Sequence, residues 1–457
     1  MADTLDPANV HAIFKAYDVR GIVPDQLDED LARATGRAYV EVVGSDRVIV
    51  GHDMRPSSPG LAGAFAVGAT AAGADVTMIG LASTDQLYFA SGHLDVPGAM
   101  FTASHNPAQY NGIKMCRAQA SPIGLESGLA EIRDRALGAA REPSGRAGSI
   151  SEHDVLGAYA AHLLSLAPVH GRRLKIVIDA GNGMAGHTAP AVFERLGDGV
   201  EVVALYFELD GTFPNHEANP IEPENLADLQ KAVLAEGADA GLAFDGDADR
   251  CFVVDENGRA VSPSTLTALI AARELLKEPG ATVIHNLITS RAVPEIVAEL
   301  GGKPVRTRVG HSFIKATMAE TGAIFGGEHS GHFYFRDFWR ADSGMLAALH
   351  TLAALAETDR PLSGLLAEYE RYPMSGEINS EVADQAAVIE ELEATYAGSD
   401  RVTTDRLDGL TVSHPDWTFN VRPSNTEPLL RLNVEGRGEA TMTATRDDVL
   451  ALIRKDR

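Results

Sequence analysis

One order of strands and helices occurs three times along the chain, and it limits the possible folds more than any other feature of the sequence. Each copy begins with an apolar strand that ends in a small or polar turn, at 47–51, 175–179 and 282–286. Each turn is followed by an alanine-rich helical stretch, at 58–72, 184–196 and 292–300. Strands that alternate with helices are typical of doubly wound parallel sheets. A repeat of this length predicts three related α/β domains.

Each copy continues with two more strands and ends in a polar loop. The second strands are expected at 74–79, 200–205 and 304–309, and the third strands at 98–101, 240–244 and 322–325. The polar loops cover 102–107, 245–250 and 327–332. Ligands of open α/β sheets bind beyond the carboxyl ends of the strands, so we expect the loops to face one active-site cleft between the domains. Any α/β protein shows such alternation, and the pattern alone leaves the relationship of the copies open.

The length and the changes in composition predict four domains. A chain of 457 residues exceeds what one hydrophobic core usually holds. The segment 142–149 is typical of a linker, Asn257-Gly258 marks a turn after the second copy, and the sequence beyond about Arg371 changes to an α+β character. We predict three similar α/β domains and a smaller C-terminal α+β domain, with bounds 1–150, 151–257, 258–371 and 372–457.

The charge of the chain restricts its partners. The formal net charge is -25 at pH 7, which disfavours nucleic acid and anionic membrane surfaces. A small anionic ligand remains compatible through local arginine, lysine and backbone N–H groups. The two cysteines, Cys116 and Cys251, form no CxxC pattern, which indicates a reducing compartment. The acidic start lacks a signal peptide and no apolar run reaches membrane-spanning length, so we predict a cytoplasmic protein.

The second polar loop places three carboxylates at alternate positions, Asp245, Asp247 and Asp249. Unpaired, they would repel one another, and a divalent cation relieves that repulsion. A calcium EF-hand is excluded because Arg250 takes the position of its required glycine and a strand follows. Hard oxygen ligands then favour Mg²⁺. The alternative is a solvated acidic turn.

The first polar loop, 102–107, presents the hydroxyl of Ser104 at the end of an apolar strand. Pro107 directs Asn106 toward an extended backbone and prevents a simple helix. The alternative is an ordinary Ser/Asn turn. The loop is significant because the other loops supply chemistry that can act on this serine.

Three further loops carry polar side chains suited to a phosphorylated sugar. Gly326–His332 combines Glu328 and Ser330, which suit sugar hydroxyls, on a glycine-rich turn. A metal site from His329 and His332 is the alternative, but the neighbouring sequence offers no further ligands at metal spacing. The segment 422–428 offers Arg422 for bidentate phosphate binding, or is simply a proline-bounded turn. The segment 310–315 adds a histidine and a lysine, either of which could merely begin a helix.

Together these loops resemble the α-D-phosphohexomutase family, most closely its bacterial phosphomannomutase/phosphoglucomutase branch. The matching stretches occur in the family's order and span nearly the whole chain. They are 15–21, 102–107, 110–114, 245–250, 327–332 and 422–426. Six such motifs in sequence are highly specific.

The resemblance implies an isomerase that moves a phosphoryl group within a hexose phosphate. Ser104 would be the phosphoserine, and its phosphate would complete a Mg²⁺ site with Asp245, Asp247 and Asp249. The implied catalytic residues are Ser104, His105, Lys114, Arg20 and Arg250. The implied substrate-binding residues are Tyr17, His311, Glu328, Ser330, His332, Arg422, Ser424, Asn425 and Thr426. The four domains would respectively carry the phosphoserine, Mg²⁺, sugar and phosphate loops.

The resemblance further implies a mechanism through a hexose 1,6-bisphosphate, which acts as intermediate and activator. A general base for the attacking hydroxyl is required, and Lys114, His105 and His311 are the candidates. The sequence departs from the family at Ile288, where some dual-specificity members place a sugar-contacting lysine. That contact is either absent or replaced by Arg291.

The predicted substrate is mannose phosphate, with glucose phosphate as a possible second substrate. Phosphoglucosamine mutase is the alternative within the family, and His329 favours the mannose/glucose branch over it. A Mg²⁺-dependent sugar phosphatase is the alternative from another class. The retained Ser104 and aspartates argue against a catalytically silent sugar-phosphate sensor. The sequence does not determine the oligomeric state.

Overall fold

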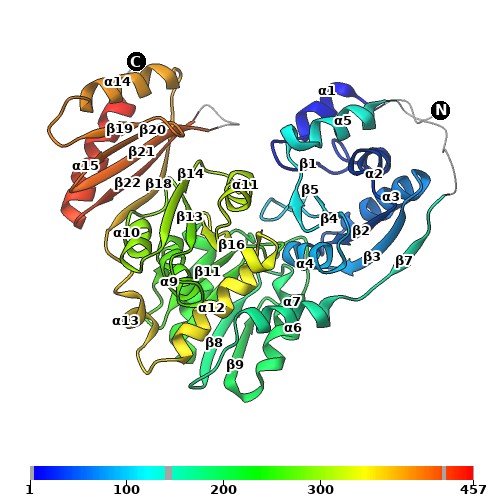
Figure 1. Cartoon of the computed structure of the whole chain (residues 1–457), viewed down its shortest axis with the longest axis horizontal. Coiled ribbons are helices and arrows are strands. Elements are labelled where there is room, and N and C mark those ends of the chain that lie inside the picture. The colour runs from blue at the N-terminus through cyan, green and yellow to red at the C-terminus, as the bar shows by residue number, and fades with distance from the viewer. Residues whose placement is uncertain (1–4, 139–146, 425–428, 456–457) are drawn as a thin grey trace. The chain divides into compact units, whose positions relative to one another are not determined.

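The structure is a computed structural model of the chain. It describes residues 5–138, 147–424 and 429–455. The chain forms two compact units, one from 1–262 with 330–363, and one from 263–329 with 364–457. Each unit is described by itself below, with element labels as in Figure 1.

The first sheet of unit 1 has the strand order β1-β5-β4-β2-β3-β7, with β6 paired to β5. Its strands are β1 (Val19–Ile22), β2 (Arg47–His52), β3 (Asp75–Leu81), β4 (Gly98–Phe101), β5 (Tyr110–Arg117), β6 (Ser121–Pro122) and β7 (Ile150–Glu152). Its helices are α1 (Pro7–Ile13), α2 (Glu29–Val43), α3 (Ser58–Ala71), α4 (Thr84–Leu94) and α5 (Leu129–Leu137), with the 3₁₀ turn η1 (Leu125–Ser127). The strands β2, β3, β4 and β7 run parallel, whereas β5 is antiparallel to β4 and β1.

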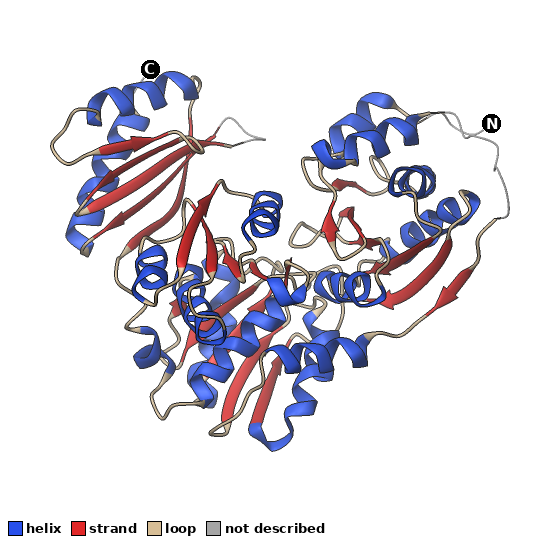
Figure 2. Ribbon diagram, viewed as in Figure 1, coloured by secondary structure: helices blue, strands red, loops and turns tan. Residues whose placement is uncertain are grey.

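Alternation along the central strand explains why helices cover both faces of this sheet (Figure 2). Val48 and Val50 belong to the core cluster that α2 and α3 build around Phe65. Ile49, between them, is equally buried but belongs to the opposite face, because successive strand residues point to opposite sides. The helix α4 packs against β4 and β2.

The second sheet of unit 1 has the order β12-β11-β10-β8-β9. Its strands are β8 (Leu174–Asp179), β9 (Val200–Leu205), β10 (Ala240–Phe244), β11 (Cys251–Asp255) and β12 (Ala260–Val261). Its helical elements are α6 (Leu156–Leu166), α7 (Ala185–Phe193), η2 (Glu194–Gly199), η3 (Pro223–Leu226) and α8 (Ala227–Glu236). The strands β8, β9 and β10 are parallel, and β11 returns antiparallel to β10. The segment 330–363 adds β16 (Phe333–Phe335), η4 (Arg336–Phe338), β17 (Ala341–Asp342) and α12 (Gly344–Ala356), and α13 (Leu362–Leu366) follows.

Unit 2 contains parallel strands and an antiparallel sheet. Its parallel strands lie in the order β14-β13-β15. They are β13 (Thr282–Asn286), β14 (Lys303–Thr307) and β15 (Phe325–Gly327), with the helices α9 (Pro263–Lys277), α10 (Ala292–Glu299) and α11 (His311–Thr321). The strand expected at 322–325 begins only at Phe325, because Gly322 adopts a left-handed conformation (φ 67°) that ends α11.

The C-terminal sheet of unit 2 is antiparallel, with the order β18-β22-β21-β20-β19. Its strands are β18 (Met374–Glu381), β19 (Thr403–Asp405), β20 (Leu410–His414), β21 (Trp417–Pro423) and β22 (Leu429–Gly436). Apolar side chains of this sheet pack with those of α14 (Gln385–Tyr396) and α15 (Glu439–Ile453) around Phe419 and Leu432. This is the α+β domain expected at the C-terminal end of the sequence.

Among the described residues, no helix combines the length and the apolar character needed to cross a lipid bilayer.

Burial of His285 in β13 makes the stability of unit 2 depend on pH. Burial lowers the pKa of the His285 imidazole from 6.5 to about 4. Because the unfolded chain binds the proton more readily, this contribution to stability is complete above pH 6.5 and is lost as the pH falls through about 4. The loss is about 3 kcal/mol at 1.36 kcal/mol per pKa unit. Urea unfolding at several pH values should show this slope in wild type and lose it in His285→Gln. Equal slopes in the two proteins would contradict it.

Candidate active site

The serine loop, residues 102–107, begins where the fully buried strand β4 ends. Ser104 adopts a left-handed backbone conformation (φ 50°), which is uncommon for a residue with a side chain. Its backbone N–H donates to Thr102 Oγ1 at 2.9 Å, and the serine is 5% exposed. The hydroxyl is thus fixed at the carboxyl end of a central strand, the position that the sequence predicted.

The guanidinium of Arg55 stabilises the serine loop through hydrogen bonds to its backbone. It donates to backbone carbonyl oxygens at 2.6 to 2.9 Å, those of Ser104, Asn106, Pro107 and Tyr110. Its side chain is fully buried and pairs with Asp53 at 3.2 Å. The sequence analysis missed Arg55. The sequence feature that could have indicated it is the pair Asp53 and Arg55, which follows β2 at the same sheet edge as Ser104.

The metal loop, residues 245–250, lies against the serine loop within unit 1. Ser104 Oγ donates to Asp245 Oδ2 at 2.7 Å. A Cβ atom added at Gly246 would come within 2.3 Å of the Ser104 carbonyl oxygen, so the close approach of the two loops requires glycine there. The structure therefore brings together Ser104 and the first predicted metal ligand, which are 141 residues apart in the sequence.

The three aspartates of the metal loop form a group that fits a divalent cation. One carboxylate oxygen from each of Asp245, Asp247 and Asp249 can be chosen so that all lie within 4.8 Å of one another. Across the described chain, Asp247 Oδ1 and Asp249 Oδ1 are among the buried oxygens without a hydrogen-bond partner. Buried oxygens of this kind have lost water without replacement, and a Mg²⁺ ion would coordinate them.

The charges of the metal loop are strongly perturbed. Burial raises the pKa of Asp245 to about 8, and the Arg250 guanidinium offsets part of this effect. Burial would also raise the pKa of Asp247, but Lys114 outweighs it and holds that pKa well below the usual range. Lys114 Nζ lies 2.6 Å from both Asp247 Oδ2 and Asp249 Oδ2. Lys114 thus pairs with two of the three carboxyl groups, and Arg250 pairs with the third. The oxygens Asp247 Oδ1 and Asp249 Oδ1 remain without a hydrogen-bond partner, which leaves the cluster suited to a further cation.

The three candidates for a general base differ in their surroundings. His105 Nδ1 lies 3.2 Å from Ser104 Oγ, and burial, followed by Arg250 and Arg20, lowers the pKa of His105 well below 6.5. Burial would lower the pKa of Lys114, but its two aspartate partners raise it well above 10.5. His311 lies in the first turn of α11, and its side chain lies outside the described part of the structure.

Two arginines add positive charge to the serine loop. Arg250 Nε donates to Asp245 Oδ2 at 2.9 Å. Arg20, in β1, donates through one nitrogen to Asn106 Oδ1 at 2.6 Å and pairs with Asp18 through another. Tyr17, which is partly exposed, lies just before β1. The Ser104 hydroxyl thus contacts His105 and Asp245 directly. Arg250, Lys114 and Arg20 contact residues of the two loops, and their roles toward a transferring phosphoryl group stay predictions.

His332 and Ser330 border the same loop. Ser330 Oγ lies 3.0 Å from His332 Nδ1, and His332 Nε2 lies 3.7 Å from Asp249 Oδ1 and 4.0 Å from Asp342 Oδ2. Asp249, His332 and Asp342 form a second group with donor atoms within 4.8 Å. The sequence analysis found no metal-ligand partners for His332, because Asp249 and Asp342 approach it in space and not in sequence.

The remaining predicted substrate residues belong to unit 2. Glu328 Oε1 accepts from Asn286 Nδ2 at 3.3 Å and from the Gly310 N–H at 3.2 Å. Arg422 donates to Glu377 at 2.7 Å, and Ser424 Oγ lies 3.4 Å from an Arg431 nitrogen. Asn425 and Thr426 lie outside the described residues. The predicted convergence of these residues on Ser104 stays a prediction.

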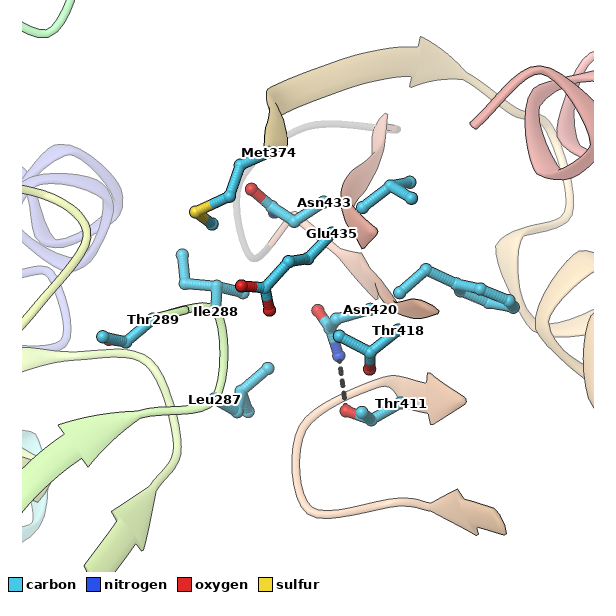
Figure 3. A pocket seen from close by; sticks show the side chains of 11 residues that line it. Leu287, Ile288, Thr289, Met374, Thr411, Thr418, Asn420, Asn433 and Glu435 are labelled. Atoms are coloured by element: carbon cyan, nitrogen blue, oxygen red, sulfur yellow. Dashed lines mark hydrogen bonds between the residues drawn. The ribbon is translucent and has the colours of Figure 1, made fainter. Parts of the chain in front are cut away.

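Ile288, which the sequence analysis expects at the position of a sugar-contacting lysine, is buried. Its side chain lines a cavity of about 30 Å³ against the C-terminal sheet, together with Glu435 and Asn433 (Figure 3). Arg291 stacks on the Tyr372 ring at 4.0 Å and donates to the carbonyl oxygen of Pro415 at 3.0 Å. In this conformation Arg291 contacts residues of unit 2, and whether it replaces the lysine stays a prediction.

Comparison with known proteins matches most of the chain to one family. Four models of phosphoglucomutase/phosphomannomutase domains match in order. The alpha/beta/alpha domains I, II and III match residues 11–140, 157–258 and 263–372, and the C-terminal domain matches 377–452. The chain belongs to the phosphoglucomutase/phosphomannomutase family. It is a phosphohexomutase, an enzyme of the isomerase class.

Individual relatives cover almost the whole chain. A protein named phosphohexose mutases from Xanthomonas campestris pv. campestris is 43% identical over 439 residues, covering 95% of this chain and 97% of the relative. A phosphomannomutase from Salmonella typhimurium is 42% identical over 445 residues, covering 96% and 97%. A crystal structure of a phosphoglucomutase/phosphomannomutase family protein from Burkholderia thailandensis superposes with a TM-score of 0.88 at 36% identity, covering 97% and 98%.

These comparisons confirm the predicted family, the enzyme class and the fold class of three α/β/α domains with a smaller C-terminal domain. The acidic group of the metal loop confirms that the chain contains side chains able to hold a metal ion. The exact domain bounds and the roles of individual residues stay predictions.

Proposed function

We propose that the protein interconverts mannose 1-phosphate and mannose 6-phosphate, with glucose phosphates as possible second substrates. Ser104 carries the phosphoryl group, and Asp245, Asp247 and Asp249 hold a Mg²⁺ ion together with the serine phosphate. The observation that carries this proposal is the 2.7 Å contact between Ser104 Oγ and Asp245 Oδ2. That contact joins the proposed nucleophile to a candidate metal-binding carboxyl group in a cluster that also contains Lys114 and Arg250.

The reaction follows from the groups around Ser104. The free hydroxyl of a hexose phosphate attacks the phosphoryl group on Ser104, so a sugar O–P bond forms and the Oγ–P bond breaks. The hydroxyl proton passes to a base, for which His105, Lys114 and His311 are the candidates. The resulting hexose 1,6-bisphosphate turns over, and its other phosphate returns to Ser104. Bound Mg²⁺ neutralises charge on the transferring group, as phosphoryl transfer requires.

Positioning by the protein accounts for most of the expected rate. Arg55 fixes the backbone of the serine loop through four hydrogen bonds, and a fixed nucleophile avoids the entropy cost of alignment. Arg250, which is buried, and Lys114 and Arg20, which are partly buried, supply positive charge, and shielding from water strengthens electrostatic stabilisation. We infer that Glu328, Ser330 and His332 bind the sugar and that the segment from Arg422 binds its distal phosphate.

The mannose preference is supported by relatives that carry the name phosphomannomutase, at 42% identity for the Salmonella typhimurium protein. The test is the comparison of kcat/KM for mannose 1-phosphate, glucose 1-phosphate and glucosamine 1-phosphate, with a trace of hexose 1,6-bisphosphate. We expect mannose 1-phosphate to give the highest value and glucosamine 1-phosphate the lowest. The highest value for glucosamine 1-phosphate would contradict the proposal. Net release of inorganic phosphate without isomerisation would instead identify a phosphatase.

A further inference from the structure

The first turn of α4 contacts the metal loop through Thr84. Thr84 Oγ1 donates to Asp247 Oδ2 at 2.6 Å, and the Thr84 backbone N–H donates to the Asp247 carbonyl oxygen at 3.0 Å. Thr84 is fully buried. A single residue of the first domain therefore holds both the side chain and the backbone of a candidate metal ligand that lies 163 residues away in the sequence.

The next residue, Asp85, fastens this turn to two other helices. Asp85 Oδ2 accepts from Tyr159 Oη at 2.7 Å and from Ser343 Oγ at 2.6 Å, and Oδ1 accepts from Ser83 Oγ. Tyr159 lies in α6, and Ser343 is the N-cap of α12. All these groups belong to unit 1. Asp85 thus links three helices that are distant in sequence at the point where α4 meets the metal loop.

The hydrogen bonds of Asp85 indicate that this carboxyl group holds the first turn of α4 in a defined position. The carboxyl group is fully buried, and its described hydrogen-bond partners are hydroxyl groups and not a cation. A buried carboxyl group without a cationic partner is costly for the fold. Its directional hydrogen bonds nevertheless fix the first turn of α4 relative to α6 and α12. They therefore also fix the position of Thr84.

We propose that Thr84 and Asp85 are positioning residues for the metal site, with Thr84 orienting Asp247 and Asp85 fixing Thr84. Thr84 and Lys114 occupy Asp247 Oδ2, which leaves the buried Oδ1 without a hydrogen-bond partner and able to serve as the metal ligand. This inference rests on the proposed ligand set of Asp245, Asp247 and Asp249. Partners that orient metal ligands are typically worth about 10- to 100-fold in metal affinity.

The test measures Mg²⁺ affinity by isothermal titration calorimetry on the full chain without substrate, beside the thermal unfolding midpoint. Thr84→Val removes the hydroxyl at nearly constant shape, and we expect it to raise the Mg²⁺ Kd by about 10-fold or more. Thr84→Ser keeps the hydroxyl, and its Mg²⁺ Kd should stay within about threefold of wild type, as a positioning role through this hydroxyl requires.

Asp85→Ala should raise the Mg²⁺ Kd by a similar factor. Because Asp85 acts through Thr84, the double variant Thr84→Val/Asp85→Ala should bind Mg²⁺ no more weakly than the weaker single variant, whereas independent effects would multiply. If the effects of the two single variants on the Mg²⁺ Kd multiply in the double variant, Asp85 does not act through Thr84 and this part of the proposal is overturned.

Ser91→Ala is the matched control, because Ser91 is also buried in α4 and donates its hydroxyl to the Val96 carbonyl oxygen at 2.8 Å. It should lower the unfolding midpoint and leave the Mg²⁺ Kd unchanged. If Thr84→Val behaves like this control, the inference is overturned and the proposed function is unaffected. If wild type phosphorylated on Ser104 binds no Mg²⁺, the proposed ligand set is overturned and the inference falls with it.

Discussion

Replacing Ser104 by alanine is expected to lower kcat/KM by a factor on the order of 10⁴ or more, because loss of a covalent nucleophile removes the reaction path itself. The side chain makes one hydrogen bond to Asp245 and lies near His105, so the fold should survive its removal. A coupled assay of mannose 1-phosphate isomerisation measures the rate, and circular dichroism checks the fold.

Ser91→Ala serves again as the comparison, because it removes a buried serine hydroxyl from the same domain away from the metal loop. It should retain turnover close to wild type. Turnover by Ser104→Ala within about tenfold of this control would remove the phosphoserine from the mechanism, since general positioning effects alone account for changes of that size.

Replacing Asp247 by asparagine is expected to have the second-largest effect. The change keeps the size of the side chain but removes its negative charge. That charge pairs with Lys114, and Mg²⁺ requires it in a ligand. We expect kcat to fall by a factor on the order of 10² to 10³, as for the loss of one electrostatic stabiliser. The Mg²⁺ concentration that gives half-maximal activity should rise in the same variant, and a magnesium titration of the rate measures both.

A matched control for this prediction is Asp255→Asn. Asp255 is also buried, at the far end of β11, and accepts from the backbone N–H groups of Asn257 and Arg259 at 2.9 Å. It should affect stability and leave the magnesium titration unchanged. An unchanged titration in Asp247→Asn as well would place the cation elsewhere.

The sequence predicted the site where a strand runs directly into a polar loop. Ser104 follows β4 and Asp245 follows β10, and the carboxyl ends of such strands are the usual ligand edge of an α/β sheet. The sequence also predicted that the Asp245 loop ends in a strand, and β11 begins at Cys251. Local order along the chain was sufficient for these features.

The residues that support the site could not be predicted in the same way. Arg55 binds backbone carbonyl oxygens about fifty residues away, and Thr84 reaches Asp247 across 163 residues. Neither contact leaves a periodic pattern or a characteristic spacing, because the two partners lie far apart in the sequence. For the same reason the group of Asp249, His332 and Asp342 was missed. Tertiary packing alone brings these residues together.

In the secondary structure, too, some elements could be predicted from local sequence and others could not. The helix expected at 58–72 is α3, Ser58–Ala71, and the helix expected at 292–300 is α10, Ala292–Glu299. The antiparallel strand β5, Tyr110–Arg117, was not part of the repeated pattern, although it carries Lys114 into the site. Its role depends on the turn of the serine loop, which reverses the chain beside β4.

The most direct test of the account is the transfer of labelled phosphate between a hexose 1,6-bisphosphate and the protein. Wild-type protein incubated with ³²P-labelled bisphosphate and Mg²⁺ should acquire label on Ser104 alone, located by peptide mass spectrometry. Excess unlabelled mannose 6-phosphate should then remove that label into bisphosphate and monophosphate sugars. Label on another residue, or isomerisation without any label on the protein, would contradict the central claim that Ser104 carries the transferring group.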